Sequence, residues 1–128
     1  MSEDINKNAT DLQIDLTYLN EIASGSAEFM IEMIDIFLEQ TPEYLQQLTD
    51  SVKVQDWKSV GDIAHKIKPT LAFMGVEYAR EVMTEIERKA RNLDAVETIE
   101  EDLTYINGIS STLYSRLNEH KKELESQL

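Results

Sequence analysis

Cysteine is absent from this 128-residue chain, and proline and glycine are scarce, with two and four copies. Without cysteine there is no disulfide, no zinc ribbon and no thiol nucleophile. Because helix breakers are few and no polar–apolar alternation persists, the sequence predicts helices rather than strands. No apolar run approaches the roughly 20 residues that a membrane-spanning helix needs, and the polar, acidic first residues do not form a secretory signal. We therefore expect an all-α, cytoplasmic protein.

Positive charge is also in short supply. Twelve lysines and arginines stand against 25 aspartates and glutamates, which gives a net charge of −13. A phosphate backbone or an anionic membrane surface would repel such a chain, so neither nucleic acid nor a membrane is an expected partner. The length and the 41% apolar content suit one domain with one hydrophobic core.

Apolar residues recur at spacings of three and four, which predicts a series of helices. The expected helices cover residues 14–23, 26–40, 42–53, 56–74, 76–91 and 96 to about 117. Ser26 is expected to cap the second helix, and Thr41 with Pro42 is expected to begin the third, as N-cap and first helical residue. Gly75 is expected to end the fourth helix in a left-handed conformation.

Long helices joined by short turns pack as antiparallel neighbours. The fold class that we predict is all-α, an antiparallel up-and-down four-helix bundle with a short extra N-terminal helix. The bundle is expected over residues 14–118, after a flexible segment at 1–13 and before a polar helix end or frayed tail at 119–128.

The helix around His65 is the most informative one. Its predicted buried stripe consists of Trp57, Val60, Ala64, Ile67, Leu71 and Met74. His65 lies off that stripe, on the side of the helix that also holds Gly61, Lys68, Pro69 and Ala72. The imidazole is therefore predicted to project from an outer face, among small side chains and one cation, where another protein can reach it.

A displayed histidine is a nucleophile that is substantially neutral near pH 7. One ring nitrogen can attack a phosphoryl group while the other holds a proton against a nearby acceptor. Lys68, on the same face as His65, can stabilise charge on the transferring oxygens. We expect these two residues to carry the chemistry. The surface expected to dock a partner consists of Lys58, Gly61, Asp62, Lys66, Pro69 and Ala72.

The segment Ala64-His65-Lys66-Ile67-Lys68, with Gly75 further on, resembles the motif H-x-[LI]-K-G-[SA]-[SA]-x-x-x-G. This is the motif of the histidine-containing phosphotransfer (HPt) domain of bacterial multistep phosphorelays, a form of two-component signalling. Two flanking segments are also similar to that family. They are Phe37-Leu38 followed by Pro42, and Ile86-Glu87 followed by Arg91.

The resemblance implies that His65 accepts a phosphoryl group from a receiver-domain aspartate and passes it to an aspartate of another receiver. It implies a phosphoryl-stabilising role for Lys68 and a turn role for Gly75. The implied partners are response-regulator receiver domains and a hybrid sensor histidine kinase. The Mg²⁺ would belong to the receiver, so no cofactor is expected on this chain. A monomeric phosphotransfer intermediate without an ATP site, rather than an autonomous enzyme, is the implied function.

Pro69 departs from the family, which usually has glycine there. Proline inside a helix cannot donate to the carbonyl four residues back, here that of His65, at a cost of ~3 kcal/mol or a kink. A bend beside His65 would favour a second function, a helical adaptor that binds a receiver or a partner helix without phosphotransfer. A third function, a metal-binding bundle, would use Asp62 and His65, but the second metal motif that it requires is missing, so no metal site is expected. His120 is expected to be a structural or surface histidine.

Overall fold

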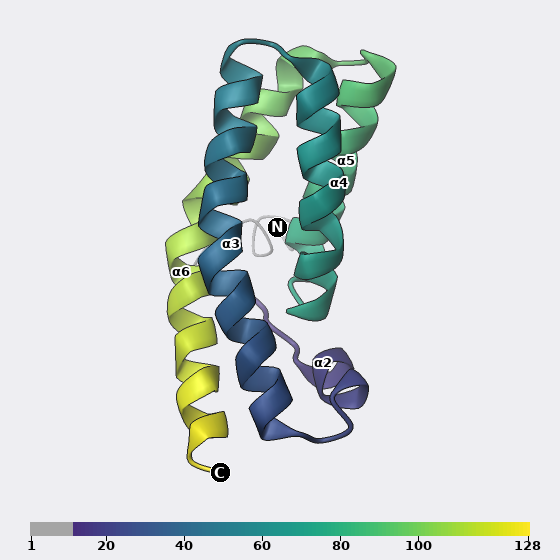
Figure 1. Ribbon diagram of the computed structural model, residues 1–128. Coiled ribbons are helices and arrows are strands. Elements are labelled where there is room, and N and C mark those ends of the chain that lie inside the picture. The colour runs from purple at the N-terminus through teal and green to yellow at the C-terminus, as the bar shows by residue number, and fades with distance from the viewer. Residues whose placement is uncertain (1–11) are drawn as a thin grey trace, which may run out of the picture.

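The computed structural model describes residues 12–128, and every regular element in that range is a helix. The elements are α2 (Thr17–Ile22), α3 (Ala27–Lys53), α4 (Trp57–Phe73), α5 (Glu77–Asn92), the 3-10 helix η2 (Val96–Thr98) and α6 (Ile99–Glu125). Figure 1 shows α3 and α6 as long antiparallel neighbours, α4 and α5 as a shorter antiparallel pair beside them, and α2 at the lower end. The predicted all-α four-helix bundle with a short extra N-terminal helix is confirmed.

Each long helix buries one apolar face in a common core. On α4 the buried residues include Val60, Ala64, Ile67 and Leu71, in agreement with the predicted stripe, while Trp57 at its start is half-buried. On α6 the spacing of three and four continues through Leu103, Ile106, Ile109, Leu113 and Leu117, all buried. Fully burying one such side chain stabilises the fold by about 1.5–3 kcal/mol, so these stripes determine which side of each helix faces outward.

The prediction that Thr41 and Pro42 separate two helices was wrong. α3 is one helix from Ala27 to Lys53 with Pro42 inside it, and Thr41 is buried rather than capping a helix end. The buried face of α3 keeps its spacing across the proline, because Phe37, Thr41, Leu45 and Leu48 all point into the core. Burying that face outweighs the ~3 kcal/mol that an interior proline costs.

The ends of α3 and α4 follow local rules. Ser26 accepts a hydrogen bond from the backbone N–H of Phe29 at 3.2 Å, as an N-cap does. Asp56 caps α4 in the same way through the N–H of Ser59, at 3.3 Å. α4 remains helical through Pro69 and ends at Phe73, so Pro69 does not end the helix beside His65.

Gly75 joins the end of α4 to the N-terminal part of the chain. Its φ of +69° lies in the left-handed region, and the N–H of Val76 donates to the carbonyl of Leu71 at 3.0 Å, which completes a Schellman motif. The N–H of Asp15 donates to the carbonyl of Gly75 at 3.2 Å. A Cβ at position 75 would lie only 1.8 Å from the carbonyl oxygen of Asp15, so only glycine fits this crossing.

The described part of the bundle begins earlier than predicted. Leu12 is buried in the core, and its carbonyl accepts a hydrogen bond from Arg116 of α6. Residue 12 therefore packs with the bundle, two residues before the predicted boundary, whereas residues 1–11 of the predicted flexible segment lie outside the described residues. At the other end α6 continues as a helix to Glu125. Among residues 12–128, no helix is long and apolar enough to cross a membrane.

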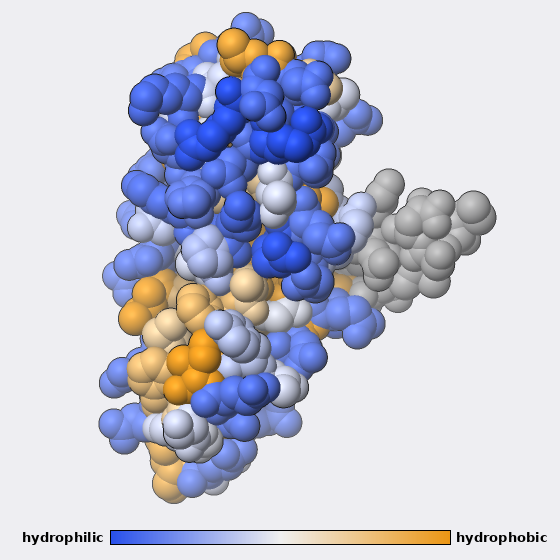
Figure 2. Space-filling view, turned by 90° about the vertical axis from the view of Figure 1, so that its right-hand side faces the viewer, coloured by the Kyte–Doolittle hydropathy of each residue, from blue (hydrophilic) through white to orange (hydrophobic). Residues whose placement is uncertain are grey.

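Several large apolar side chains remain at the surface near α2. Tyr18 and Ile22 of α2 are exposed, as are Phe29 and Ile36 of α3. Figure 2 shows apolar side chains gathered in the lower half of this face, while the upper half is mostly hydrophilic apart from apolar side chains at its upper end. Phe73, the last residue of α4, belongs to the same region because its ring stacks on Tyr18 at a centroid distance of 5.7 Å. We refer to these five residues as the apolar patch.

Candidate functional site

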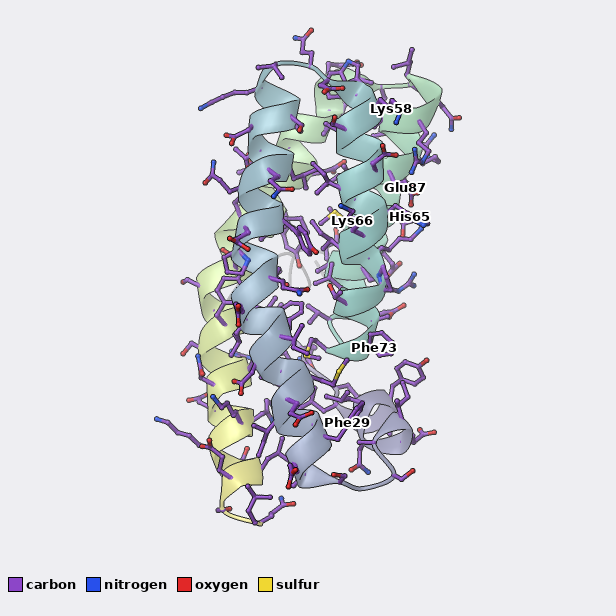
Figure 3. The ribbon with its side chains drawn as sticks, in the orientation of Figure 1. Phe29, Lys58, His65, Lys66, Phe73 and Glu87 are labelled. Atoms are coloured by element: carbon purple, nitrogen blue, oxygen red, sulfur yellow. The ribbon has the colours of Figure 1, made fainter. Side chains whose placement is uncertain are left out.

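His65 lies on the outer side of α4, where α5 runs alongside. Its side chain is 67% exposed, as its position off the buried stripe predicts. Figure 3 shows His65 and Glu87 next to each other at the boundary between α4 and α5. The Nδ1 atom of His65 lies 2.9 Å from Oε2 of Glu87, which is a hydrogen-bond distance. One ring nitrogen is therefore held by the protein and the other is left free.

Glu87 is the centre of the site, although its side chain is only 13% exposed. Its Oε1 accepts from Lys68 Nζ at 2.7 Å, and its Oε2 accepts from Arg91 Nε at 3.2 Å as well as facing His65. Burial alone would raise the pKa of Glu87, but hydrogen bonds from Lys68 and Arg91 outweigh burial and hold this pKa below its ordinary value. Glu87 is therefore a carboxylate at neutral pH and can only accept hydrogen bonds.

The charge on Glu87 determines what His65 can do. Because a carboxylate has no proton to donate, the hydrogen bond at 2.9 Å requires the proton to be on Nδ1 of His65. In the neutral ring the lone pair is then on Nε2, which the protein leaves open to a partner. This is the tautomer that a nucleophilic histidine needs for attack through Nε2. Lys68 donates to the same carboxylate, and a rotation of its side chain would bring its Nζ toward Nε2 of His65.

The predicted docking residues do not form one group around His65. Lys58 is exposed and pairs with Asp62 at 3.0 Å. Lys66 points to the other side of α4, where its Nζ lies 5.7 Å from the ring centroid of Tyr44 on α3. Pro69 is exposed and Ala72 is half-buried on the outer side of α4.

Gly61 was predicted on the open docking surface, and this was wrong. Gly61 is buried, and its carbonyl accepts from Arg91 Nη2 at 3.3 Å. Arg91 comes from α5 and covers this turn of α4, so a partner meets the arginine rather than the glycine. The helical phase placed Gly61 correctly beside His65, but it contained no information about which side chain of another helix would cover it.

Asp62 is paired with two cationic side chains. It accepts from Lys58 at 3.0 Å and from Arg91 Nη1 at 3.0 Å, and these bonds lower its pKa. No group of three or more potential metal-ligating side chains occurs between residues 12 and 128. His120 lies on α6, where its Nδ1 is 3.7 Å from Glu123, and is not part of this cluster.

Two residues of the site, Glu87 and Arg91, were absent from the predicted set. Both lie on α5, four residues apart and so on the same face of the helix. In the sequence they stand out only as part of a segment that is similar to the HPt family. The spacing alone shows that the two side chains can meet, which they do. It does not show that Glu87 would meet His65, which lies 22 residues earlier in the chain.

Comparison with known proteins agrees with this geometry. The Hpt domain family matches residues 32–126. The phosphorelay intermediate protein rdeA of Dictyostelium discoideum is 26% identical over 110 residues, which cover 86% of this chain and 43% of that protein. This chain thus spans less than half the length of that relative.

A solved structure shares the fold. The HPT domain of a sensor hybrid histidine kinase from Shewanella superposes with a TM-score of 0.67 at 18% identity, and the match covers 98% of each chain. The family match begins in α3 and ends in the last residues of the chain, and it includes both helices that build the site around His65. This chain belongs to the Hpt domain family.

Proposed function

We propose that the protein is a phosphocarrier in a phosphorelay. His65 accepts a phosphoryl group from the aspartyl phosphate of one receiver domain and passes it to an aspartate of another. The observation that supports this most strongly is the hydrogen bond between His65 Nδ1 and Glu87, at 2.9 Å, on a side chain that is 67% exposed. It presents an unprotonated Nε2 to a partner. The family match and the similarity to a phosphorelay intermediate protein support the same function.

The proposed transfer balances without a cofactor on this chain. The Nε2 lone pair of His65 attacks the phosphorus, an N–P bond forms, and the P–O bond to the aspartate breaks with its electrons on the carboxylate. Nδ1 keeps its proton, and the positive charge that develops on the ring is stabilised by the Glu87 carboxylate at 2.9 Å. Transfer to the second receiver is the reverse of these steps. The chain therefore serves as an intermediate and needs no ATP site of its own.

Lys68 is proposed to stabilise the transferring group. In the free protein its Nζ lies 2.7 Å from Glu87 Oε1, and its flexible stem allows it to turn toward phosphoryl oxygens at Nε2. The Mg²⁺ of the reaction is assigned to the receiver. Asp62, the acidic side chain nearest to His65 on α4, is already paired with Lys58 and Arg91.

The receiver is proposed to dock over the outer face of α4 and the apolar patch. From His65 to Phe73 is eight residues, or about 12 Å along a helix, which is well within the footprint of one protein domain. The contact surface proposed around His65 consists of Lys58, Asp62, Pro69 and Ala72, with Arg91 in place of Gly61. Lys66 is left out of it, because its side chain turns toward Tyr44 of α3. We propose that a hybrid sensor kinase is the source of the phosphoryl group and that the transfer takes place in the cytoplasm. The protein is proposed to be a monomer, which leaves this face open to a receiver.

The proposal is tested by phosphotransfer from a phosphorylated receiver domain of the same organism. Wild-type protein and the control His120→Gln should both acquire an acid-labile, alkali-stable label, whereas His65→Gln should acquire none and keep its helical circular dichroism spectrum. Label on His65→Gln would assign the chemistry to another residue. Failure of the wild type with every receiver tried, while it still binds a receiver, would favour the non-phosphorylating adaptor.

A further inference from the structure

Arg91 donates three hydrogen bonds at the site, two of which cross from α5 to α4. Its Nε donates to Glu87 Oε2 on its own helix at 3.2 Å. Across the boundary with α4, its Nη1 donates to Asp62 Oδ1 at 3.0 Å and its Nη2 donates to the carbonyl of Gly61 at 3.3 Å. A guanidinium is planar with donors in a fixed arrangement, so three acceptors in these directions determine where the group lies.

Gly61 provides the space in which this guanidinium lies. A Cβ at position 61 would be 3.1 Å from Cγ and 3.3 Å from Nη1 of Arg91, closer than side chains normally pack. Glycine inside a helix is less favourable than alanine, and this glycine is buried in the first half of α4. Its missing side chain lets the arginine lie directly against the helix backbone.

We infer that Arg91 is a positioning residue for His65, which acts through Glu87 and depends on the space left at Gly61. The inference rests on the proposed phosphocarrier function, and it adds to it the residues that hold the reactive tautomer. Arg91 and His65 share the same oxygen, Oε2, whereas Lys68 takes Oε1. Arg91 therefore holds the carboxylate of Glu87 in the orientation in which one oxygen faces the imidazole.

The consequence of losing Arg91 follows from the remaining contacts. Glu87 would keep a close cation in Lys68, at 2.7 Å on Oε1, but nothing would hold Oε2 at its present place apart from the histidine itself. The carboxylate can then rotate toward Lys68, and Nδ1 loses its acceptor for part of the time. A ring without that acceptor can carry its proton on Nε2, and in this form Nε2 has no lone pair with which to attack.

The test uses Gly61→Ala, Arg91→Gln and Arg91→Lys, with Arg88→Gln as the matched control. Arg88 lies on the same helix and pairs with Glu85 and Asp94 at the surface, away from His65. The first readout is the tautomer of His65 from ring ¹⁵N chemical shifts at a pH where the ring is neutral. The second is the rate constant of phosphotransfer from a phosphorylated receiver.

Wild type and Arg88→Gln should show the proton on Nδ1. Gly61→Ala and Arg91→Gln should show a substantial fraction with the proton on Nε2, and transfer slowed roughly tenfold or more, toward the hundredfold that a 1 Å misplacement can cost. Arg91→Lys keeps the charge but not the planar guanidinium, so its tautomer ratio and transfer rate should resemble those of Arg91→Gln. Chemical denaturation should show that all variants are folded at the temperature of the assay.

The two measurements distinguish failure of the positioning role of Arg91 from failure of the phosphocarrier function. The tautomer is measured without any receiver, so unchanged ¹⁵N shifts in folded Gly61→Ala and Arg91→Gln would overturn the positioning role even if His65 carries a phosphoryl group. A wild type that holds the proton on Nδ1 but accepts no phosphoryl group would overturn the carrier function and leave the geometry of the inference intact. A normal transfer rate in variants with altered tautomers would also contradict the inference.

Discussion

Substitution of Gly75 by alanine is expected to destabilise the protein strongly. The added Cβ would lie 1.8 Å from the carbonyl oxygen of Asp15 and 2.4 Å from its carbonyl carbon, so the backbone before α2 must move away. Position 75 also has a φ of +69°, and a residue with a Cβ pays about 1–2 kcal/mol in that left-handed region. Alanine recovers only about 0.4–1 kcal/mol of this by restricting the unfolded chain.

Displacement of the backbone accounts for the rest of the expected loss of stability. The hydrogen bond from Asp15 to Gly75, 3.2 Å long, would be lost, at about 0.5–1.5 kcal/mol. Leu12, which this crossing holds in the core, would lose burial worth up to about 1.5–3 kcal/mol. We expect the free energy of unfolding of Gly75→Ala to fall by about 3–5 kcal/mol, with a fall in melting temperature of roughly 10–20 °C for a domain of this size.

Chemical denaturation followed by circular dichroism and Trp57 fluorescence measures this change, since the indole is half-buried at the start of α4. Gly108→Ala is the matched control. Gly108 is in the middle of α6, and a Cβ there would meet nothing within 4 Å, so alanine should stabilise the protein by about 0.5–1 kcal/mol. A Gly75→Ala variant as stable as wild type would refute the steric reasoning, as would an equal loss in Gly108→Ala.

Three further predictions concern charge. Lys68→Ala should slow phosphotransfer by about 10²–10³, the usual cost of losing one donor to a transition-state oxyanion, whereas Lys66→Ala, whose Nζ lies over Tyr44 instead, should transfer at nearly the wild-type rate. The pKa of Glu87 is held below 4.5 in the folded protein. The ionised carboxylate therefore stabilises the fold above pH 4.5, and this stabilisation is lost as the pH falls through the folded pKa. In acid denaturation curves, the stability difference between wild type and Glu87→Gln should shrink accordingly. Burial raises the pKa of Tyr105 and Tyr114 to about 12, so ultraviolet titration should find two late tyrosines, and stability should fall as the pH rises from about 10 to about 12.

Local regularities of the sequence predicted the helices well. The buried stripe of α4 follows from its spacing of three and four, and the cap at Ser26 follows from a side chain that accepts from a free N–H group. The error at Pro42 has the opposite origin. Proline is a local signal for a helix start, but here the packing of residues on both sides of it keeps α3 continuous. Local preference is decisive at a helix end and is overruled in the middle of a well-packed helix.

The composition of the site depends on which side chains of α5 reach α4, and no single-helix pattern contains that information. Gly61 was placed on the correct face of α4 but was assigned to the surface, because Arg91, which covers it, lies 30 residues further along the chain. Glu87 is one of several acidic residues on α5, and Glu77, Glu81 and Glu85 look alike in the sequence. What distinguishes Glu87 is its low exposure between two helices and the three donors around it.

The phase of both helices taken together does contain the missing information. Every residue of the site follows directly after a buried residue of its own helix. The pairs are Val60-Gly61, Ala64-His65 and Ile67-Lys68 on α4, and Ile86-Glu87 and Ala90-Arg91 on α5. One position along a helix is a rotation of 100°, always in the same sense. When two helices run in opposite directions, equal rotations from their buried stripes lead to the same side of the pair, as they do in an antiparallel coiled coil. The antiparallel order of α4 and α5 was predictable from the short turn between them. Helical phase and chain direction therefore place Glu87 and Arg91 on the same side of the helix pair as His65. The packing adds the level along the helix axes, with 2.9 Å between His65 and Glu87 and 3.2 Å between Glu87 and Arg91.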